Sequence, residues 1–381
     1  MMAATTPQCL ILDNSPPSDG PLGSLASFVS VLLPPAVYFF MDDSGGDGTA
    51  RSFLKMDAGG NFQLKSWTGG PKNIVQAAVA NGVIYALDGQ NIDDVWISSD
   101  DGTNWTLVDT PSSNESEKLA HVIDCGGNVI VSHATISHTS GGSHPAYITK
   151  DGGLSWQEWR LGFGPASAGE TSVYAMDCTS DRLFVAGTSS NTFQWAATPA
   201  LNAWTQATAA PGVVYTAYGS IATSGTGVIG LNYDNGMFTG AELAYSTSFA
   251  NGMASAGSMP HMGCGTCGNT EYGISSATNN RFFVSEADST NKICRVYSSV
   301  DGSTAPASST IAALDCSSVG TPGAMPGLLV SRFGIFTSYR NSTGTQTGLL
   351  KSSDGGATLT KVDLSSVWTD SGFITDIEES P

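Results

Sequence analysis

The residue types that bind metals come closest together in one glycine-rich segment. His261, Cys264 and Cys267 stand three residues apart, as His-x2-Cys-x2-Cys. Imidazole and thiolate groups are zinc ligands, but a tetrahedral site needs four of them and this segment offers three. We therefore expect no metal or other cofactor, and either a disulfide between the two cysteines or two free thiols. The other five cysteines are expected to be buried, small apolar side chains.

Acidic pairs offer a second kind of chemistry. Asp42 and Asp43 are adjacent, as are Asp93 and Asp94, and both pairs fall between predicted strands. Two carboxyl groups, one acting as acid and the other as base or nucleophile, are what glycoside hydrolysis requires. Solvated loop acids are the simpler interpretation, and a glycoside hydrolase that uses these pairs is kept as an alternative.

A third set of carboxylates recurs in a fixed pattern. Four eight-residue segments place Asp third, Gly fifth and a large apolar residue eighth, and three of them begin with Ser or Thr. An Asp side chain accepts hydrogen bonds from backbone N–H groups of its own turn, and Gly adopts positive φ without steric cost. The pattern predicts a structural turn that packs on its apolar residue. The four segments are Asp57, Gly59, Phe62; Asp100, Gly102, Trp105; Asp151, Gly153, Trp156; and Asp354, Gly356, Leu359.

These segments resemble the Asp-box, or BNR repeat, of sialidase-like β-propellers. Three degenerate copies, at 197–204, 246–253 and 298–305, fill the interval between the third and fourth boxes. Seven boxes about fifty residues apart predict seven blades of four short strands. The resemblance implies that the boxes lie between third and fourth strands on one face, and that ligands bind at the opposite face.

Apolar runs separated by turn residues give the strands of each unit. The clearest unit has an inner strand at 73–80, a second at 83–88, a third at 94–99 and a fourth at 105–109, with Asn81-Gly82 as a hairpin turn. Later inner strands are expected at 120–124, 172–177, 214–218, 272–276 and 328–331. The sequence therefore predicts an all-β fold, a seven-bladed β-propeller with four-stranded blades.

The two ends of the chain are expected to meet in the first blade. Its second to fourth strands are predicted near 37–40, 51–56 and 62–67, and the C-terminal segment 372–378 reads as one more inner strand. That strand closes the ring and removes open edges; the competing candidate is 26–32. Residues 1–33 are interpreted as an extended N-terminal arm and 34–381 as the propeller.

The catalytic residues of sialidases are not recognisable here. Those enzymes clamp a carboxylate with three arginines and carry an Arg-Ile-Pro motif, which this chain lacks. Arg182 and Arg281 begin second strands and so belong to the box face, which leaves Arg160 and Arg340 for the pocket face. The resemblance is therefore to a non-catalytic member of the superfamily.

Composition excludes several classes of partner. With 15 Lys and Arg against 33 Asp and Glu, the net charge is −18, so no nucleic acid is expected as partner. The apolar run 25–40 is interrupted by Pro34 and Pro35, which argues against a membrane span. No basic residue precedes Arg51, so no cleaved signal peptide is expected. The sequons at Asn104, Asn114 and Asn341 are interpreted as accidental.

We expect a non-enzymatic structural or binding propeller, located in a virion or extracellular. Chains of this type, poor in Lys and rich in Gly, Ser and Thr, resemble phage virion and tail-fibre propellers, with the arm 1–33 held by other proteins of a large assembly. A glycan or cell-surface receptor is the expected ligand, and an assembly-factor propeller is a further alternative. The candidate ligand-binding residues are Tyr233, Asn235, Phe238, Tyr339 and His138.

Overall fold

In the computed structural model, β-strands are the only regular elements of the described residues. Of these residues, none belongs to a helix with the length and apolar character that crossing a membrane requires. The expected arm 1–33 lies outside the described part. The described ranges are 34–42, 51–89, 94–110, 119–133, 144–161, 173–179, 182–187, 193–197, 205–207, 218–224, 227–233, 241–246, 254–258, 274–277, 281–288, 293–299, 312–315, 322–324, 327–341, 347–368 and 373–380.

The described strands pair into seven antiparallel sheets. The first combines the C-terminal strand with three N-terminal ones, in the order β29 (Phe373–Glu379), β1 (Ala36–Asp42), β2 (Ser52–Asp57) and β3 (Phe62–Ser66). The second contains β4 (Ile74–Ala80), β5 (Val83–Asp88), β6 (Asp94–Ser98) and β7 (Thr106–Asp109). The third contains β8 (Leu119–Cys125), β9 (Asn128–His133), β10 (His144–Thr149) and β11 (Gln157–Leu161).

The remaining four sheets repeat this order. They contain β12 (Val173–Thr179), β13 (Arg182–Gly187), β14 (Phe193–Ala197) and β15 (Thr205–Ala207); then β16 (Tyr218–Ser224), β17 (Gly227–Tyr233), β18 (Ala241–Ser246) and β19 (Ala254–Ser258). They continue with β20 (Ile274–Ala277), β21 (Arg281–Asp288), β22 (Ile293–Ser299) and β23 (Ala312–Asp315). The last has β24 (Pro322–Ala324), β25 (Leu328–Ser331), β26 (Gly334–Asn341), β27 (Thr347–Ser352) and β28 (Thr360–Lys361).

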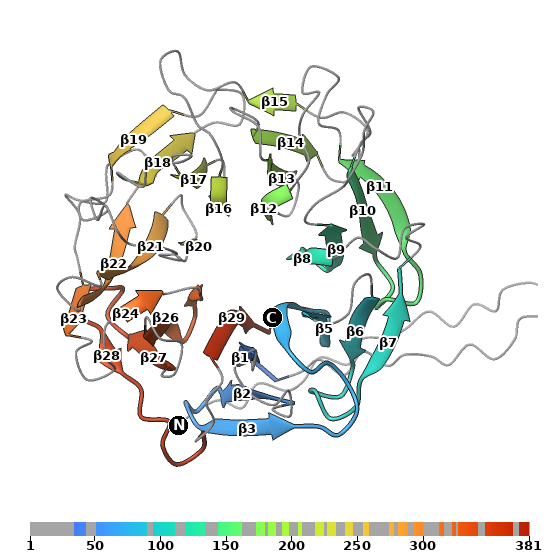
Figure 1. Ribbon diagram of the computed structural model, residues 1–381, viewed down its shortest axis with the longest axis horizontal. Coiled ribbons are helices and arrows are strands. Elements are labelled where there is room, and N and C mark those ends of the chain that lie inside the picture. Colours follow the sequence, from blue (N-terminus) through green and yellow to red (C-terminus); the bar gives the residue numbers. More distant parts are fainter. Residues whose placement is uncertain are drawn as a thin grey trace, which may run out of the picture. The chain divides into compact units, whose positions relative to one another are not determined.

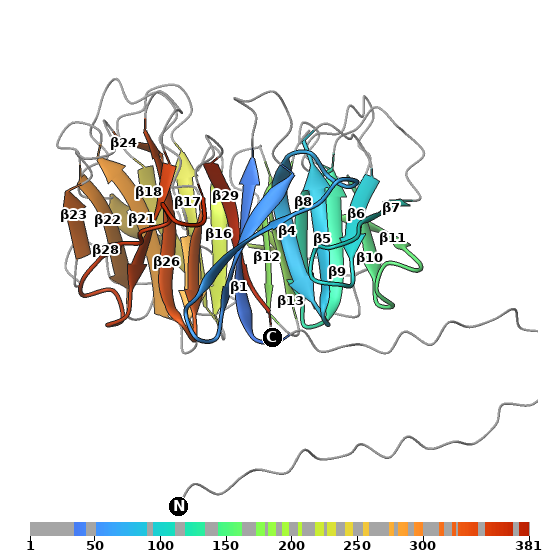
Figure 2. The same cartoon turned by 90° about the horizontal axis from the view of Figure 1, so that it is seen from below.

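The sheets of residues 34–380 stand side by side around a central opening (Figure 1), and their strands run along the axis of that opening (Figure 2). The predicted all-β, propeller-like fold is thus confirmed. Apolar side chains of neighbouring sheets meet between them. One such cluster combines Tyr38, Phe40 and Phe53 of the first sheet with Ala77 and Ile84 of the second. Because core lies on both sides of a sheet, β5 is buried along nearly its whole length, whereas the outer strands β3 and β7 are mostly exposed.

The C-terminal strand closes the first sheet, as the sequence predicted. β29 pairs with β1, for example Phe39 opposite Ile377. The backbone N–H of Ala36 donates to the hydroxyl of Ser380 at 2.8 Å, and the N–H of Ser380 donates to the carbonyl of Ala36 at 2.9 Å. The competing segment 26–32 lies outside the described residues.

One predicted inner strand is placed differently, and the last sheet has an additional short strand beside the predicted inner strand 328–331, which is β25. The expected strand 214–218 is wrong, because β16 spans Tyr218–Ser224 and residues 214–217 lie outside the described part. The prediction relied on the apolar residues Val213, Val214 and Tyr215, whereas the strand contains the buried residues Ile221 and Ala222. In the last sheet, both β24 and β25 pair with β26, so one edge carries two short strands in place of one.

A disulfide joins two neighbouring sheets, which corrects the expectation of buried thiols. Cys125 ends β8 and Cys178 lies in β12, with their Cα atoms 5.6 Å apart although 53 residues separate them in sequence. Cys294 is also disulfide-bonded, to a residue outside the described part. Such pairing depends on the distance between strand ends of different sheets, and the spacing of cysteines does not reveal it.

Candidate functional site

Three of the four predicted turns share one hydrogen-bond arrangement. In the turn after β6, the Asp100 carboxylate accepts bonds from the Asn104 N–H at 2.8 Å and from the Ser98 hydroxyl at 3.0 Å. The Ser98 hydroxyl in turn accepts the Gly102 N–H at 2.9 Å. The turns at Asp151 and Asp354 repeat these contacts with Thr149 and Ser352 as the hydroxyl residues. The Ser or Thr that opens the pattern therefore completes the turn.

Packing explains why a glycine occupies the same position in each of these turns. Gly102, Gly153 and Gly356 have φ of 78°, 86° and 93°. A Cβ on Gly102 would overlap the Phe53 ring of the preceding sheet, and one on Gly153 would overlap Ile97 of its own preceding sheet. Each of these two turns thus lies directly on the sheet before it, where only a glycine fits.

The first turn departs from the predicted geometry. Gly59 does not have positive φ; Gly60 does, at 82°. Here the Gly59 N–H donates to the Asp57 carboxylate itself at 2.8 Å. The reason is that Lys55 occupies the position of the Ser or Thr, so no hydroxyl is available to accept that N–H.

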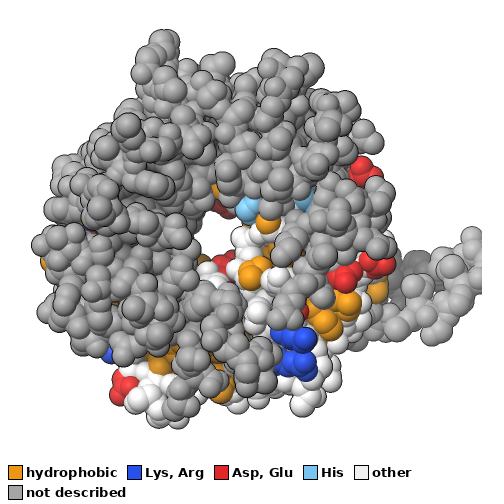
Figure 3. Space-filling model, viewed as in Figure 1, with side chains coloured by type: hydrophobic (Ala, Val, Ile, Leu, Met, Phe, Trp, Pro, Cys, Tyr) orange, Lys and Arg blue, Asp and Glu red, His pale blue; other side chains and the backbone are white. Residues whose placement is uncertain are grey.

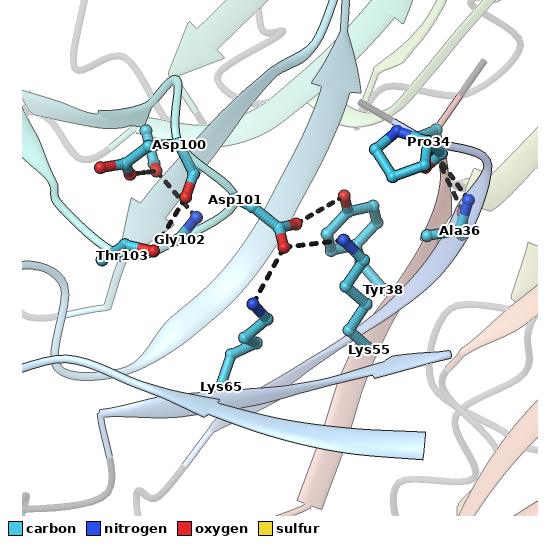
Figure 4. Close-up of polar contacts among 11 residues, drawn as sticks. Pro34, Ala36, Tyr38, Lys55, Lys65, Asp100, Asp101, Gly102 and Thr103 are labelled. Atoms are coloured by element: carbon cyan, nitrogen blue, oxygen red, sulfur yellow. Dashed lines mark hydrogen bonds and ion pairs between the residues drawn. The ribbon is translucent and has the colours of Figure 1, made fainter. Parts of the chain in front are cut away.

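Lys55 is used in another contact, which joins the first two sheets (Figure 4). Its ammonium lies 2.7 Å from the Asp101 carboxylate, which also receives Lys65 at 3.0 Å and the Tyr38 hydroxyl at 2.9 Å. Asp101 has φ of 63°, at the turn position that Gly152 occupies in the next repeat. A non-glycine residue is strained there, and three partners hold it in place. Sequence reasoning missed this network, because its members are far apart along the chain.

The turn carboxylates are held in their ionised form. Hydrogen bonds from the Thr358 side chain and backbone lower the pKa of Asp354, and those from Asn61 lower the pKa of Asp57. Partial burial opposes ionisation at Asp100 and Asp151, but the hydrogen bonds within each turn outweigh it, and both pKa values are lowered. A carboxylate with a lowered pKa and all its partners inside its own turn is a poor general acid.

The Asn104 sequon has a structural role. Its side-chain amide donates to Asp100 at 2.6 Å within the turn, so the nitrogen that a glycan would modify is already engaged. Asn114 lies outside the described residues.

One buried group combines the residue types that sialidases use. On β21 and β22, Glu286 accepts the Tyr297 hydroxyl, and Arg295 lies 3.5 Å from the same carboxylate oxygen. Their exposed fractions are 2%, 0% and 7%. The trio is therefore enclosed between sheets, where a substrate does not reach it.

Carboxylates gather on the inner strands. Asp124 on β8, Asp177 on β12, and Asp376 and Glu378 on β29 interact electrostatically, and Figure 3 shows acidic side chains at the wall of the central opening. Burial raises the pKa of Asp177 and of Asp376 to about 6. Burial first, and then the charges of the other three acids, raise the pKa of Glu378 well above its usual range. No group of described residues has the ligand arrangement of a metal site.

A cavity of about 320 Å³ lies beside this cluster, near the C-terminal end of β29. It is lined by Val79, Asp124, Arg332, Glu379 and Ser380. Arg332 pairs with Glu379, and its guanidinium also donates to the Ser380 carbonyl at 2.6 Å. Arg332, the one basic residue among these lining residues, is therefore already paired with groups at the end of the closing strand.

Of the predicted ligand-binding residues, Tyr339 is the one whose side chain lies in the described part of the structure. Tyr339 is 1% exposed and packs against Phe283 and Leu350 in the core, so the expectation that its ring stacks on a ligand is wrong. Burial raises its pKa to about 12. The backbone of Tyr233 ends β17. The other predicted ligand residues (Asn235, Phe238 and His138) and the metal candidates (His261, Cys264 and Cys267) lie outside the described part.

Two histidines on either side of the candidate residue His138 lie in strands. His133 is the last residue of β9, has an exposed fraction of 0%, and its ring meets that of Tyr147 edge-on at 5.9 Å between centroids. His144 begins β10. His133 is thus a core residue, and the sequence signal that could have shown this is the apolar run Val129-Ile130-Val131 shortly before it.

Comparisons with known proteins support the fold alone. No family model matches the chain, and no curated protein does. Among solved structures, YCF48 bound to a D1 peptide is 10% identical with a TM-score of 0.50, over 76% of this chain and 80% of that one. The fold is that of a β-propeller.

Two enzymes or candidate enzymes have the same fold. A putative 6-phosphogluconolactonase from Bacteroides uniformis is 12% identical with a TM-score of 0.55, over 91% of this chain and 99% of that one. An ancestral GH74 enzyme is 13% identical with a TM-score of 0.54, over 87% of this chain and 47% of that one. At such identities the likeness carries no activity to this propeller.

Proposed function

We propose that this propeller binds a partner without turning it over. The observation that carries the proposal is that the described groups resembling catalytic machinery are engaged in holding the fold. The carboxylates of Asp57, Asp100, Asp151 and Asp354 accept donors of their own turns. The Glu286 trio is buried between strands.

We further propose that the seven sheets are the blades of one seven-bladed propeller, and that the four turns are Asp-boxes of the sialidase-like superfamily. The hydrogen bonds shared by the turns at Asp100, Asp151 and Asp354, and the packing of Gly102 and Gly153 on the preceding sheet, support this. In such a scaffold the boxes act as joints between blades, and recognition falls to the loops of the opposite face.

The proposed setting is a large assembly, most consistent in type with a phage virion or tail fibre. The arm 1–33 is proposed to contact other proteins of that assembly. The proposed ligand is a glycan or cell-surface receptor, bound at the face opposite the Asp turns through Tyr233, Asn235, Phe238 and His138. Aromatic rings stack on sugars, and amides bond to sugar hydroxyls.

A glycan array together with a panel of glycosidase substrates tests this proposal. We expect binding that is lost in Tyr233→Ala and Phe238→Ala, kept in Gln63→Ala on the exposed outer strand β3, and accompanied by no hydrolysis. Finding the protein in purified virions would support the proposed setting. Hydrolysis that disappears in Asp43→Asn or Asp94→Asn would replace this proposal with the glycoside hydrolase alternative.

The assembly-factor alternative is supported by the likeness to YCF48, a propeller solved with a bound peptide. Pull-down with the chain as bait would distinguish it: a peptide partner in place of a glycan favours the assembly factor.

A further inference from the structure

The inner strands differ in charge from the rest of the protein. The described residues of β4, β8, β12, β16, β20, β24, β25 and β29 include five carboxylates and no Lys or Arg. The acids are Asp124, Asp177, Asp376, Glu378 and Glu379, and His121 on β8 is the one imidazole on these described strands. Like charges this close repel one another when they are ionised, and little water is present to screen them.

Three of these acids, Asp376, Glu378 and Glu379, belong to the strand that closes the ring. Asp376 on β29 accepts the Ala77 N–H of β4 at 2.8 Å, and Thr375 donates to the Ile74 carbonyl at 2.8 Å. These side-chain bonds join β29 to the next sheet.

The next junction offers an internal comparison. Gln76 on β4 accepts the Val122 N–H of β8 at 3.1 Å. The geometry is the same as at Asp376, since both side chains bond to an N–H of the following inner strand. At this junction a neutral amide accepts the N–H, whereas a carboxyl group accepts it at the ring closure. A negative charge is therefore not needed for this hydrogen bond.

The groups packed around β29 offer little compensating charge. Arg332, beside β25, is engaged by Glu379 and the Ser380 carbonyl. On β27, Lys351 lies over the Phe336 ring at 5.2 Å. On the strands in contact with β29, the other described titratable side chains are Tyr38 on β1 and Tyr339 on β26. The clustered acids Asp124 and Asp177 lie on β8 and β12.

We propose that the inner-strand carboxylates form a proton-dependent latch on ring closure. When the cluster is protonated, β29 is held firmly against β4. When the cluster ionises, repulsion among Asp376, Glu378 and Asp124 loosens β29 more than β12, because β29 carries two acids of the cluster. Asp177, which accepts the Thr223 N–H of β16, is the one cluster acid on β12.

The direction of the proton affinities agrees with this geometry. Burial raises the pKa of Asp376 to about 6, so this acid ionises between acidic and neutral surroundings, and burial together with the neighbouring acids raises the pKa of Glu378 well above its usual range. The lowered pKa values of the turn acids keep those groups ionised throughout that interval. The inner-strand carboxylates therefore change their charge over this pH range, whereas the turn carboxylates do not.

Amide hydrogen exchange of the full chain at pH 5.0 and 7.5, corrected for intrinsic rates, tests the latch. We expect protection of the β29 amides, Ile377 among them, and of the adjacent Ser380 amide to fall by about tenfold at pH 7.5 relative to the amides of β5. Glu378→Gln and Asp376→Asn are expected to remove most of that difference. Glu158→Gln, the same chemical change on an exposed position of the outer strand β11, is expected to keep it.

Two results would overturn the proposal. One is protection of β29 that changes with pH no more than that of β5 in the unmodified protein, a measurement that needs no variant to fold. The other is a full pH effect in Glu378→Gln, which would assign the response to other groups.

Discussion

Single residues show how this fold distributes its polar chemistry. A serine or threonine hydroxyl receives the glycine N–H, and an aspartate receives the rest of the turn. The first turn, with Lys55 in place of the hydroxyl, moves the positive φ from Gly59 to Gly60. The side chain at this one position thus changes the backbone conformation of its turn, and the Lys55 ammonium contacts Asp101 instead.

Gly153 provides a test of the turn geometry. Gly153→Val places a β-branched residue at φ of 86° and forces it into Ile97, so we expect the free energy of unfolding to fall by about 1–3 kcal/mol. Urea denaturation measures it. Gly152→Ala is the matched control, because it has a similar φ of 76° but no atom within contact distance of an added Cβ. An equal loss in both variants would show that packing on the preceding sheet contributes nothing.

Tyr339 separates a core role from a binding role. Tyr339→Ala removes a ring that is 1% exposed and packed in a core cluster, so we expect destabilisation by about 3–5 kcal/mol. Thermal unfolding measures this, and Tyr339→Phe should remain close to the parent because it keeps the ring. A Tyr339→Ala variant of unchanged stability would contradict the buried placement.

Strands and turns show which features can be predicted from sequence. The Asp turns and their hairpins depend on neighbouring residues, so the spacing of residue types was enough to locate them. The closing strand β29 was predicted from the repeat of four strands per sheet. The Cys125–Cys178 disulfide, the burial of Tyr339 and the Asp101 network were not predicted, since each depends on contacts between sheets. The strand β16 was misplaced because a short apolar run does not distinguish a strand from the segment before it.

The Cys125–Cys178 disulfide acts at the scale of whole sheets. It connects β8 to β12, and its loss allows the two sheets to separate in the unfolded chain. We expect Cys125→Ser/Cys178→Ser to lower the free energy of unfolding by about 2–4 kcal/mol. Chemical denaturation compares the double variant with the parent under non-reducing conditions, which keep the disulfide of Cys294 intact in both proteins. No difference between variant and parent would mean that the bond adds nothing to the junction.

For the whole molecule, two sets of carboxylates give opposite contributions to stability as pH changes. The turn acids have lowered pKa values, so their contribution is present above the pKa of an unfolded Asp, near 4, and is lost as pH falls. Asp177 and Asp376 have pKa values raised to about 6, so their contribution is present below about pH 4 and is lost as pH rises through 6.

The two opposing trends predict a stability maximum near pH 4, below which the contribution of the turn acids is lost and above which that of the inner-strand acids is lost. Urea denaturation at pH 3, 4.5, 6 and 7.5 measures it. Asp177→Asn keeps an oxygen that accepts the Thr223 N–H, which Asp177 binds at 2.7 Å, and it removes the charge. We expect it to raise stability at pH 7.5 while changing it little at pH 4.5, where the acid is already protonated. Asp354→Asn should act in the opposite way, because its hydrogen bonds favour the ionised form: stability falls at pH 7.5, and the loss shrinks as the solution becomes more acidic. If both variants shift stability equally at every pH, the inner strands and the turns do not differ in proton affinity.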